Sequence, residues 1–111
     1  MQLEDFPKSI RDLGLLFYEH KRQLTEVETA LKFRKAHIQI FGTFESPVTR
    51  RDPELVLKLA EDQEYTGLLN KEKDLRERLG KLEWDLGYLK DSFAVEKLRL
   101  KEKLNNNADE D

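Results

Sequence analysis

The sequence predicts an all-α fold: a long antiparallel two-helix coiled-coil hairpin, with a short helix after the loop that joins its arms. Three observations predict it: two apolar runs with alternating steps of three and four residues, an interruption between them, and only three Pro and five Gly in 111 residues. Such steps keep one stripe of a helix facing a partner helix. The first run comprises Ile10, Leu13, Phe17, His20, Leu24, Val27, Leu31, Arg34, Ile38 and Phe41, and the second comprises Leu75, Leu79, Leu82, Leu86, Leu89 and Phe93.

The first long helix is expected over about residues 7–41. Pro7 suits the first turn of a helix, where its missing N–H would have no intrahelical partner. Asp5 stands where its carboxylate can cap that turn. Gly42 follows the last apolar residue of the run, and glycine is common just past a helix end. The run therefore predicts one helix of about 35 residues, roughly 50 Å long.

Residues 42–52 form the clear break between the two runs. Gly, Ser and Pro punctuate this segment, as they do in turns and loops. Asp52 followed by Pro53 is a good pair for the N-cap and the first helical position. A short helix over 53–61 is therefore expected after the loop, and the reversal would let the second run lie against the first.

Asp62 allows two continuations of the chain. It either caps a new helix that starts at Gln63, which places a kink here, or lies within one helix that runs straight through. The long second helix is expected over 63–104. The three Asn residues that follow are poor helix formers and fair C-caps, so residues 105–111 are expected to form a disordered acidic tail after a single domain over 1–104.

The second long helix carries apolar and small residues outside its predicted seam. When its leucines occupy heptad positions a and d, Trp84 falls at f, Tyr88 at c, and Gly80 and Gly87 at b. Gly inside a helix costs about 1 kcal/mol relative to Ala. Two glycines one heptad apart, beside the only Trp, therefore indicate a place where another helix or a bulky ring can approach the backbone closely. The first helix also has apolar residues outside its stripe, namely Leu15, Tyr18, Phe33 and Ile40.

Two interpretations of this second face remain open. It is either a wide stripe with some exposed aromatic residues, as is common on protein surfaces, or a second interface. We favour the interface, because large apolar patches usually bind a partner. Homodimerisation of two hairpins into a four-helix assembly is expected first, since symmetric dimers are the commonest oligomers; docking on a different protein is the alternative. The candidate partner interface is Gly80, Trp84, Gly87 and Tyr88.

Two polar residues interrupt the seam of the first helix. His20 occupies a d position, where a polar residue can set register or oligomeric state. Arg34 also occupies a d position, and a charge in a seam needs a partner or must extend to solvent. Glu61 and Glu64 are its candidate partners, and Glu72 occupies a seam position of the second helix. We prefer a structural ion pair at Arg34; an acidic contact on a partner protein is the alternative.

Catalytic, cofactor and metal-binding motifs are absent from the sequence. It contains no Cys, and its two His stand in no HxxH or HxxE pairing, so a metal site is not expected. The Ser residues lack a nucleophile-elbow context, and the Gly residues form neither GxGxxG nor a P-loop. We therefore expect neither an enzyme nor a cofactor.

The start of the chain does not fit a signal peptide, because it is acidic and interrupted by Pro7. Apolar stretches are too short to span a membrane, and the lack of Cys gives no sign of an oxidising compartment. A cytoplasmic protein is expected.

Charge argues against a strong nucleic-acid surface. The net charge is -3. All of this excess lies in the tail, and the rest of the chain is neutral with the two signs interspersed, whereas sequence-independent binding needs a basic stripe. The best nucleic-acid candidates are Arg50 and Arg51, near two Phe residues, because Arg beside an aromatic ring suits a phosphate and a stacked base. A second basic cluster comprises Lys97, Arg99, Lys101 and Lys103.

Residues 57–104 resemble small helical coiled-coil proteins encoded in the replication and recombination gene clusters of phages and prophages. The residues that carry the resemblance are Leu59, Asp62, Glu64, Tyr65, Leu68, Leu86, Leu89 and Phe93. The resemblance implies an accessory role beside DNA enzymes, without an active site. From the residues themselves we expect a structural or adaptor protein that presents a coiled-coil surface, and the alternative is a nucleic-acid-binding accessory factor.

Overall fold

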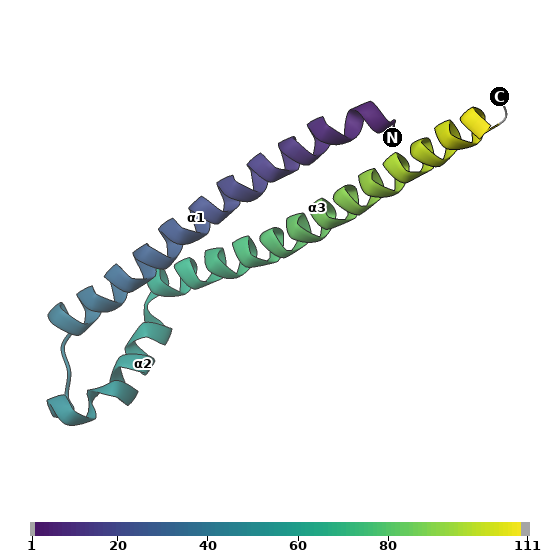
Figure 1. Cartoon of the computed structure of the whole chain (residues 1–111). Helices are drawn as coiled ribbons and strands as arrows, with labels where there is room; N and C mark the ends of the chain where they lie inside the picture. The colour runs from purple at the N-terminus through teal and green to yellow at the C-terminus, as the bar shows by residue number, and fades with distance from the viewer. Residues whose placement is uncertain (1, 110–111) are drawn as a thin grey trace. The chain divides into compact units, whose positions relative to one another are not determined.

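The computed structural model describes residues 2–109, and these residues contain helices and no strand. The expectation of an all-α fold is therefore confirmed. Figure 1 shows the three α-helices in chain order. The elements are η1 (Leu3–Asp5), α1 (Phe6–Phe41), η2 (Val48–Arg50), α2 (Arg51–Glu61) and α3 (Gln63–Asp109). Within residues 2–109, no helix has an apolar stretch long enough to cross a membrane.

The chain divides into two compact units. The central unit is His20–Arg78, which holds the end of α1, the loop, α2 and the start of α3. The terminal unit combines the residues up to Glu19 with those from Leu79 onward.

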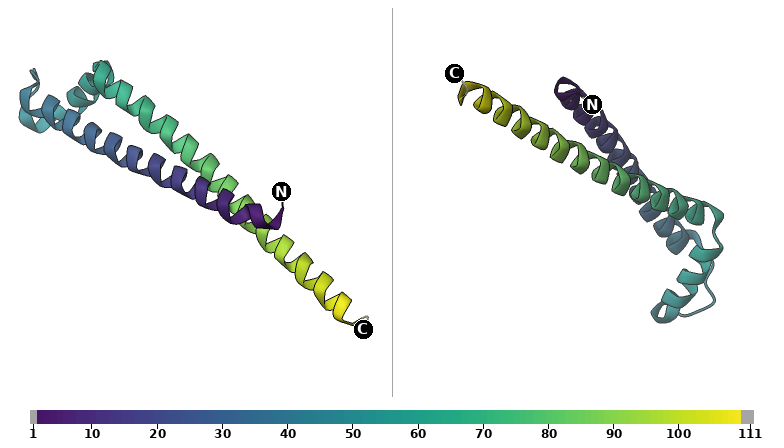
Figure 2. Two further views of the ribbon diagram at one scale, coloured as in Figure 1. Left: turned by 90° about the horizontal axis from the view of Figure 1, so that it is seen from above. Right: turned by 90° about the vertical axis from the view of Figure 1, so that its right-hand side faces the viewer.

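The core of the central unit lies where α2 meets the end of α1. Ile38 of α1 packs with Leu55 and Leu59 of α2, and the half-buried Phe44 and Tyr65 pack against this cluster. The two views of Figure 2 show α2 beside the last turns of α1. Burial of these aliphatic side chains is the main favourable term that holds α2 in place.

Ion pairs in the central unit join α1 to the segment that follows α2. Arg34 contacts Asp62 at 2.7 Å, and Arg76 contacts Glu28 at 2.8 Å. The later residue of α1 thus pairs with the earlier residue beyond α2, which is the order of two antiparallel segments. Residues 42–47 separate α1 from the turn that precedes α2.

Gly42 lies directly after α1, as expected, but its φ angle is not positive. Its N–H donates to the carbonyl oxygen of Ile38 at 2.9 Å. A Cβ at Gly42 would overlap that carbonyl oxygen, and the Phe44 ring lies 3.4 Å from the same point. Glycine is therefore required here by a close approach of the chain to itself, and not by a left-handed conformation.

The start of α2 differs from the prediction. The helix begins at Arg51 and not at Pro53, and Asp52 lies inside it, so the prediction of Asp52 as the N-cap is wrong. The physical reason is the preceding 3-10 turn, in which the N–H of Arg50 donates to the carbonyl oxygen of Pro47 at 2.8 Å. This turn leads directly into α2, so the backbone is already helical before Pro53.

Glu54 connects the first turn of α2 to the loop. Its carboxylate accepts the backbone N–H of Glu45 at 2.8 Å and that of Ser46 at 3.0 Å. These two hydrogen bonds, and that of Glu45 most of all, lower the pKa of Glu54. The loop is thus tied to α2 by a charged acceptor.

Asp62 separates α2 from α3, so of the two continuations the kinked one is correct. Its backbone is extended (φ -77°, ψ 116°), and its side chain accepts the N–H of Tyr65 at 2.8 Å. This is the hydrogen bond of an N-cap, which satisfies a backbone donor in the first turn of α3.

In the terminal unit, the start of α1 packs on α3 through two aromatic rings. Phe6 is 4% exposed, and its ring stacks on that of Phe93 with centroids 5.5 Å apart. In this unit α3 continues past the start of α1 (Figure 2).

The C-terminal end of α3 also differs from the prediction. The helix continues to Asp109, so residues 105–109 do not form the expected tail; Glu110 and Asp111 lie outside the described residues. Asn is only slightly worse in a helix than average residues. No Gly or Pro follows Leu104, and each added residue gains a backbone hydrogen bond.

The two apolar runs behave as the periodicity predicts. Their members are buried or half-buried in their units, with Phe41 as the exception at 73% exposed. Phe41 is the last residue of α1, and its ring lies 4.9 Å from that of His37 instead of in a core. The buried stripe of α1 therefore ends at Ile38.

Candidate interaction surface

The predicted interface residues lie together on α3 in the terminal unit. Trp84 is 77% exposed and Tyr88 is 68% exposed, and Gly80 and Gly87 are exposed beside them. At about 100° per residue, this face points opposite to the seam of the same helix. The described chain leaves most of it uncovered.

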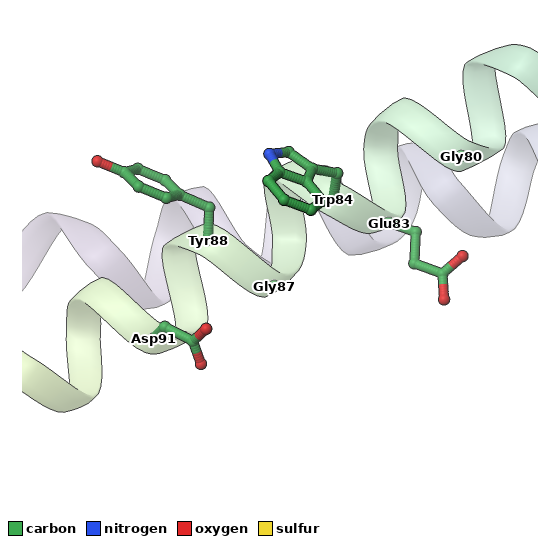
Figure 3. A pocket seen from close by; sticks show the side chains of 6 residues that line it. All are labelled: Gly80, Glu83, Trp84, Gly87, Tyr88 and Asp91. Atoms are coloured by element: carbon green, nitrogen blue, oxygen red, sulfur yellow. The ribbon is translucent and has the colours of Figure 1, made fainter.

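A shallow hollow of about 450 Å³ follows this face. Figure 3 shows the rings of Trp84 and Tyr88 along one side and the carboxylates of Glu83 and Asp91 on the other. The bare backbone at Gly87 lies between them, and that at Gly80 lines one end of the hollow. An apolar rim, an acidic rim and an accessible backbone suit a helix or a flat ring laid along the hollow.

The two glycines have no packing role within the described chain. A Cβ at Gly80 or at Gly87 would meet no atom within 4 Å. Each nevertheless weakens the helix by about 1 kcal/mol relative to Ala. The described residues contain no contact that explains this cost.

The exposed apolar face continues along α3 beyond Tyr88. Val95 and Leu98 are 46% and 60% exposed. They follow Trp84 and Tyr88 at helical spacing, so the four residues share one side of α3. We call this set, with Gly80 and Gly87, the outer stripe. All four large residues occupy the f and c heptad positions. These positions are the sequence signal from which Val95 and Leu98 could have been predicted.

Arg34 forms the best-connected polar cluster in the central unit. It donates two hydrogen bonds to Asp62, from Nε at 2.9 Å and from Nη2 at 2.7 Å, and contacts Glu64 at 3.2 Å. The expectation of an ion pair is confirmed, with Glu64 as predicted but with Asp62 in place of Glu61 as the main partner. The hydrogen bond from Arg34, followed by that from the Tyr65 N–H, lowers the pKa of Asp62 to about 2. The cluster fixes the junction of α2 and α3.

The candidate nucleic-acid residues of the loop lie at the start of α2. Arg50 is exposed. The guanidinium of Arg51 lies 5.1 Å from the centre of the Phe44 ring and donates to the carbonyl oxygen of Ser46 at 3.3 Å. The ammonium of Lys58 is 5.4 Å from the same ring. Arg51 and Phe44 thus contact each other, and Arg51 is also hydrogen-bonded to the backbone of the loop.

The second basic cluster does not form one face. Residues two apart on a helix differ by about 200°, so Lys97 and Lys101 point away from Arg99 and Lys103. The ammonium of Lys97 lies 4.0 Å from the centre of the Phe93 ring, and Arg99 pairs with Glu96 at 3.0 Å. The loop candidates belong to the central unit and this cluster to the terminal unit.

Metal-ligand geometry is not found among residues 2–109, where no three His, Asp or Glu residues converge. His20 is half-buried on α1. No protein-family model, curated protein or solved structure matches the chain. The resemblance to phage-encoded coiled-coil proteins therefore stays a prediction.

Proposed function

We propose that this chain is a non-enzymatic structural or adaptor protein. In this proposal α1 and α3 pair as an antiparallel coiled-coil hairpin through the two apolar runs. The face of α3 around Gly80, Trp84, Gly87 and Tyr88 then serves for self-association or for the capture of a partner. Two hairpins joined through this face would form a four-helix assembly.

The observation that carries the proposal is an exposed surface whose glycines lower helix stability and make no contact within the described chain. Trp84 and Tyr88 are more than two-thirds exposed, and nothing in the described chain lies near Gly80 or Gly87. Trp and Tyr are enriched at the centres of protein interfaces, where a few such residues contribute most of the binding energy. A second copy is the first candidate occupant, because homodimers are the commonest assemblies.

The test is the mass of the chain in solution, measured by light scattering on a sizing column. We expect a dimer for the natural sequence and a folded monomer for Trp84→Glu, since a charge at the interface centre would be buried without a partner. Phe33→Glu is the matched control, because Phe33 is equally exposed, at 73%, but lies on α1. A monomeric natural chain that also captures no protein partner would overturn the proposal.

Nucleic-acid binding in a phage-type replication or recombination system is the alternative. Its support is the exposed Arg50 beside Arg51 and Phe44. We favour it less, because both Arg51 and Lys58 lie over the Phe44 ring on which a base would stack. Fluorescence anisotropy with labelled single- and double-stranded DNA at low salt tests it. Salt-sensitive binding that is lost when both Arg residues become Glu would support this alternative.

A further inference from the structure

The part of α3 that carries the outer stripe changes its charge halfway along. Residues 80–91 contain three acidic and two basic residues, a net charge of -1. Residues 92–104 contain two acidic and four basic residues, a net charge of +2. A second copy in parallel orientation would place like charge on like, whereas an antiparallel copy would place the basic half on the acidic half.

We propose that the occupant of the outer stripe is a second copy of this chain, and that the two α3 helices lie antiparallel with their midpoint near Ser92. The inference rests on the proposed function and adds the orientation and the register to it. It also extends the interface to Val95 and Leu98, beyond the hollow around Trp84.

The register follows from the flanking charges. Residues that face each other across an antiparallel pair have the same mean position, and residues on one flank of the stripe meet the same flank of the copy. Two pairs of opposite charge have residue numbers that average to 92: Glu83 with Lys101, and Asp85 with Arg99. At about 100° per residue, the first pair lies on one flank and the second pair on the other. Two independent pairs thus select the same midpoint.

The apolar residues fit this register as well. Position 96 of the copy faces Tyr88, so the Tyr ring lies between Val95 and Leu98 of the copy. In the same way Trp84 faces position 100 and lies between Leu98 and Glu102. These side chains are exposed in the described chain, and they would interdigitate as knobs in holes. Arg99 now pairs with Glu96 at 3.0 Å, and both are exposed enough for the guanidinium to contact a second carboxylate.

Two contacts in this register are repulsive. Asp91 shares the f position of Trp84 and lies beside the midpoint, so it approaches Asp91 of the copy. The other repulsion is between lysines. Lys81 faces Lys103 of the copy, on the flank that also holds Asp85. The antiparallel arrangement therefore predicts that Lys81→Glu strengthens the dimer, because it turns two symmetry-related repulsions into attractions. In a parallel pair, position 81 would face its own copy, and replacing Lys by Glu would exchange one repulsion for another.

The experiment compares the dimer dissociation constant of the natural chain with that of Lys81→Glu by sedimentation equilibrium at low and high salt. We expect Lys81→Glu to bind about five- to tenfold more tightly at low salt, with the gain fading as salt screens the pairs. Lys32→Glu on α1 changes the net charge equally and serves as the matched control. A natural dimer that Lys81→Glu leaves unchanged or weakens would overturn the antiparallel register and leave the proposed function intact.

Charge reversal provides a second readout. Glu83→Lys with Asp85→Lys should abolish self-association, and so should Arg99→Glu with Lys101→Glu, whereas an equal mixture of the two variants should form a heterodimer. The chain with all four changes should self-associate like the natural chain without pairing with it. If the fully reversed chain pairs with the natural chain, the orientation is parallel and the inference fails. If the natural chain is a monomer at every concentration, self-association itself fails.

Discussion

Truncation of Trp84 to Ala should weaken self-association far more than it affects folding. The side chain is 77% exposed in the described chain, so its removal leaves no cavity and takes little from the stability of the unit. In a dimer the indole would be covered. If about 100 Å² of each ring is buried, at about 25 cal/mol per Å², each ring contributes roughly 2.5 kcal/mol.

Symmetry doubles this effect. A dimer loses both indoles, so the free energy of association falls by about 5 kcal/mol, which corresponds to a dissociation constant more than a thousandfold larger. A micromolar dimer would become a monomer at every practical concentration.

The assay is sedimentation equilibrium of the natural chain and of Trp84→Ala, with circular dichroism to compare helicity. Phe33→Ala serves as the control for the loss of an exposed ring, and it should leave the dissociation constant unchanged. A Trp84→Ala chain that dimerises within about threefold of the natural chain would refute the reasoning, because threefold is well under 1 kcal/mol. A loss of helicity in Trp84→Ala would instead place the indole in the fold of the unit.

Three further predictions concern the central unit. Asp62→Asn removes a carboxylate whose pKa is lowered to about 2 from an ordinary value of 3.8. A carboxylate whose pKa is lowered by folding stabilises the fold at any pH above its unfolded pKa. The difference in unfolding free energy between the natural chain and Asp62→Asn should therefore be constant above about pH 5 and should disappear as the pH falls toward 2. Denaturant titrations of both chains measure this difference. Leu59→Ala in the core should lower the unfolding free energy by about 2–4 kcal/mol in urea titrations, and an unchanged midpoint would contradict the described packing. Gly42→Ala should destabilise the chain in thermal melts, whereas Gly67→Ala, where a Cβ meets no atom within 4 Å, should stabilise it; equal effects would contradict the close approach at Gly42.

The periodic parts of the fold could be predicted from the sequence because they depend on local spacing. Steps of three and four residues identify the buried stripe of each long helix. Gly42 marks the end of the first helix, and the Asp62 side chain offered an N-cap as one of two continuations. Trp84 could be placed on an exposed face for the same reason, since its heptad position follows directly from the leucines around it.

The remaining features depend on contacts between segments that are distant along the chain. Arg34 pairs with Asp62 and not with Glu61, because Asp62 is the extended residue at which α2 ends. The early start of α2 depends on the turn that precedes it. Helical spacing alone does not predict these two features. The apolar continuation of the outer stripe at Val95 and Leu98, in contrast, could have been predicted from their heptad positions and was missed.

The most direct test of a covered outer stripe uses the only Trp of the chain as its own reporter. Its fluorescence emission and its accessibility to a neutral quencher are measured while the natural protein is diluted from about 200 µM to well below 1 µM, a range that brackets a micromolar dissociation constant. We predict a protected, blue-shifted indole at high concentration that becomes red-shifted and quenchable on dilution. An indole that is equally exposed at every concentration would contradict the account.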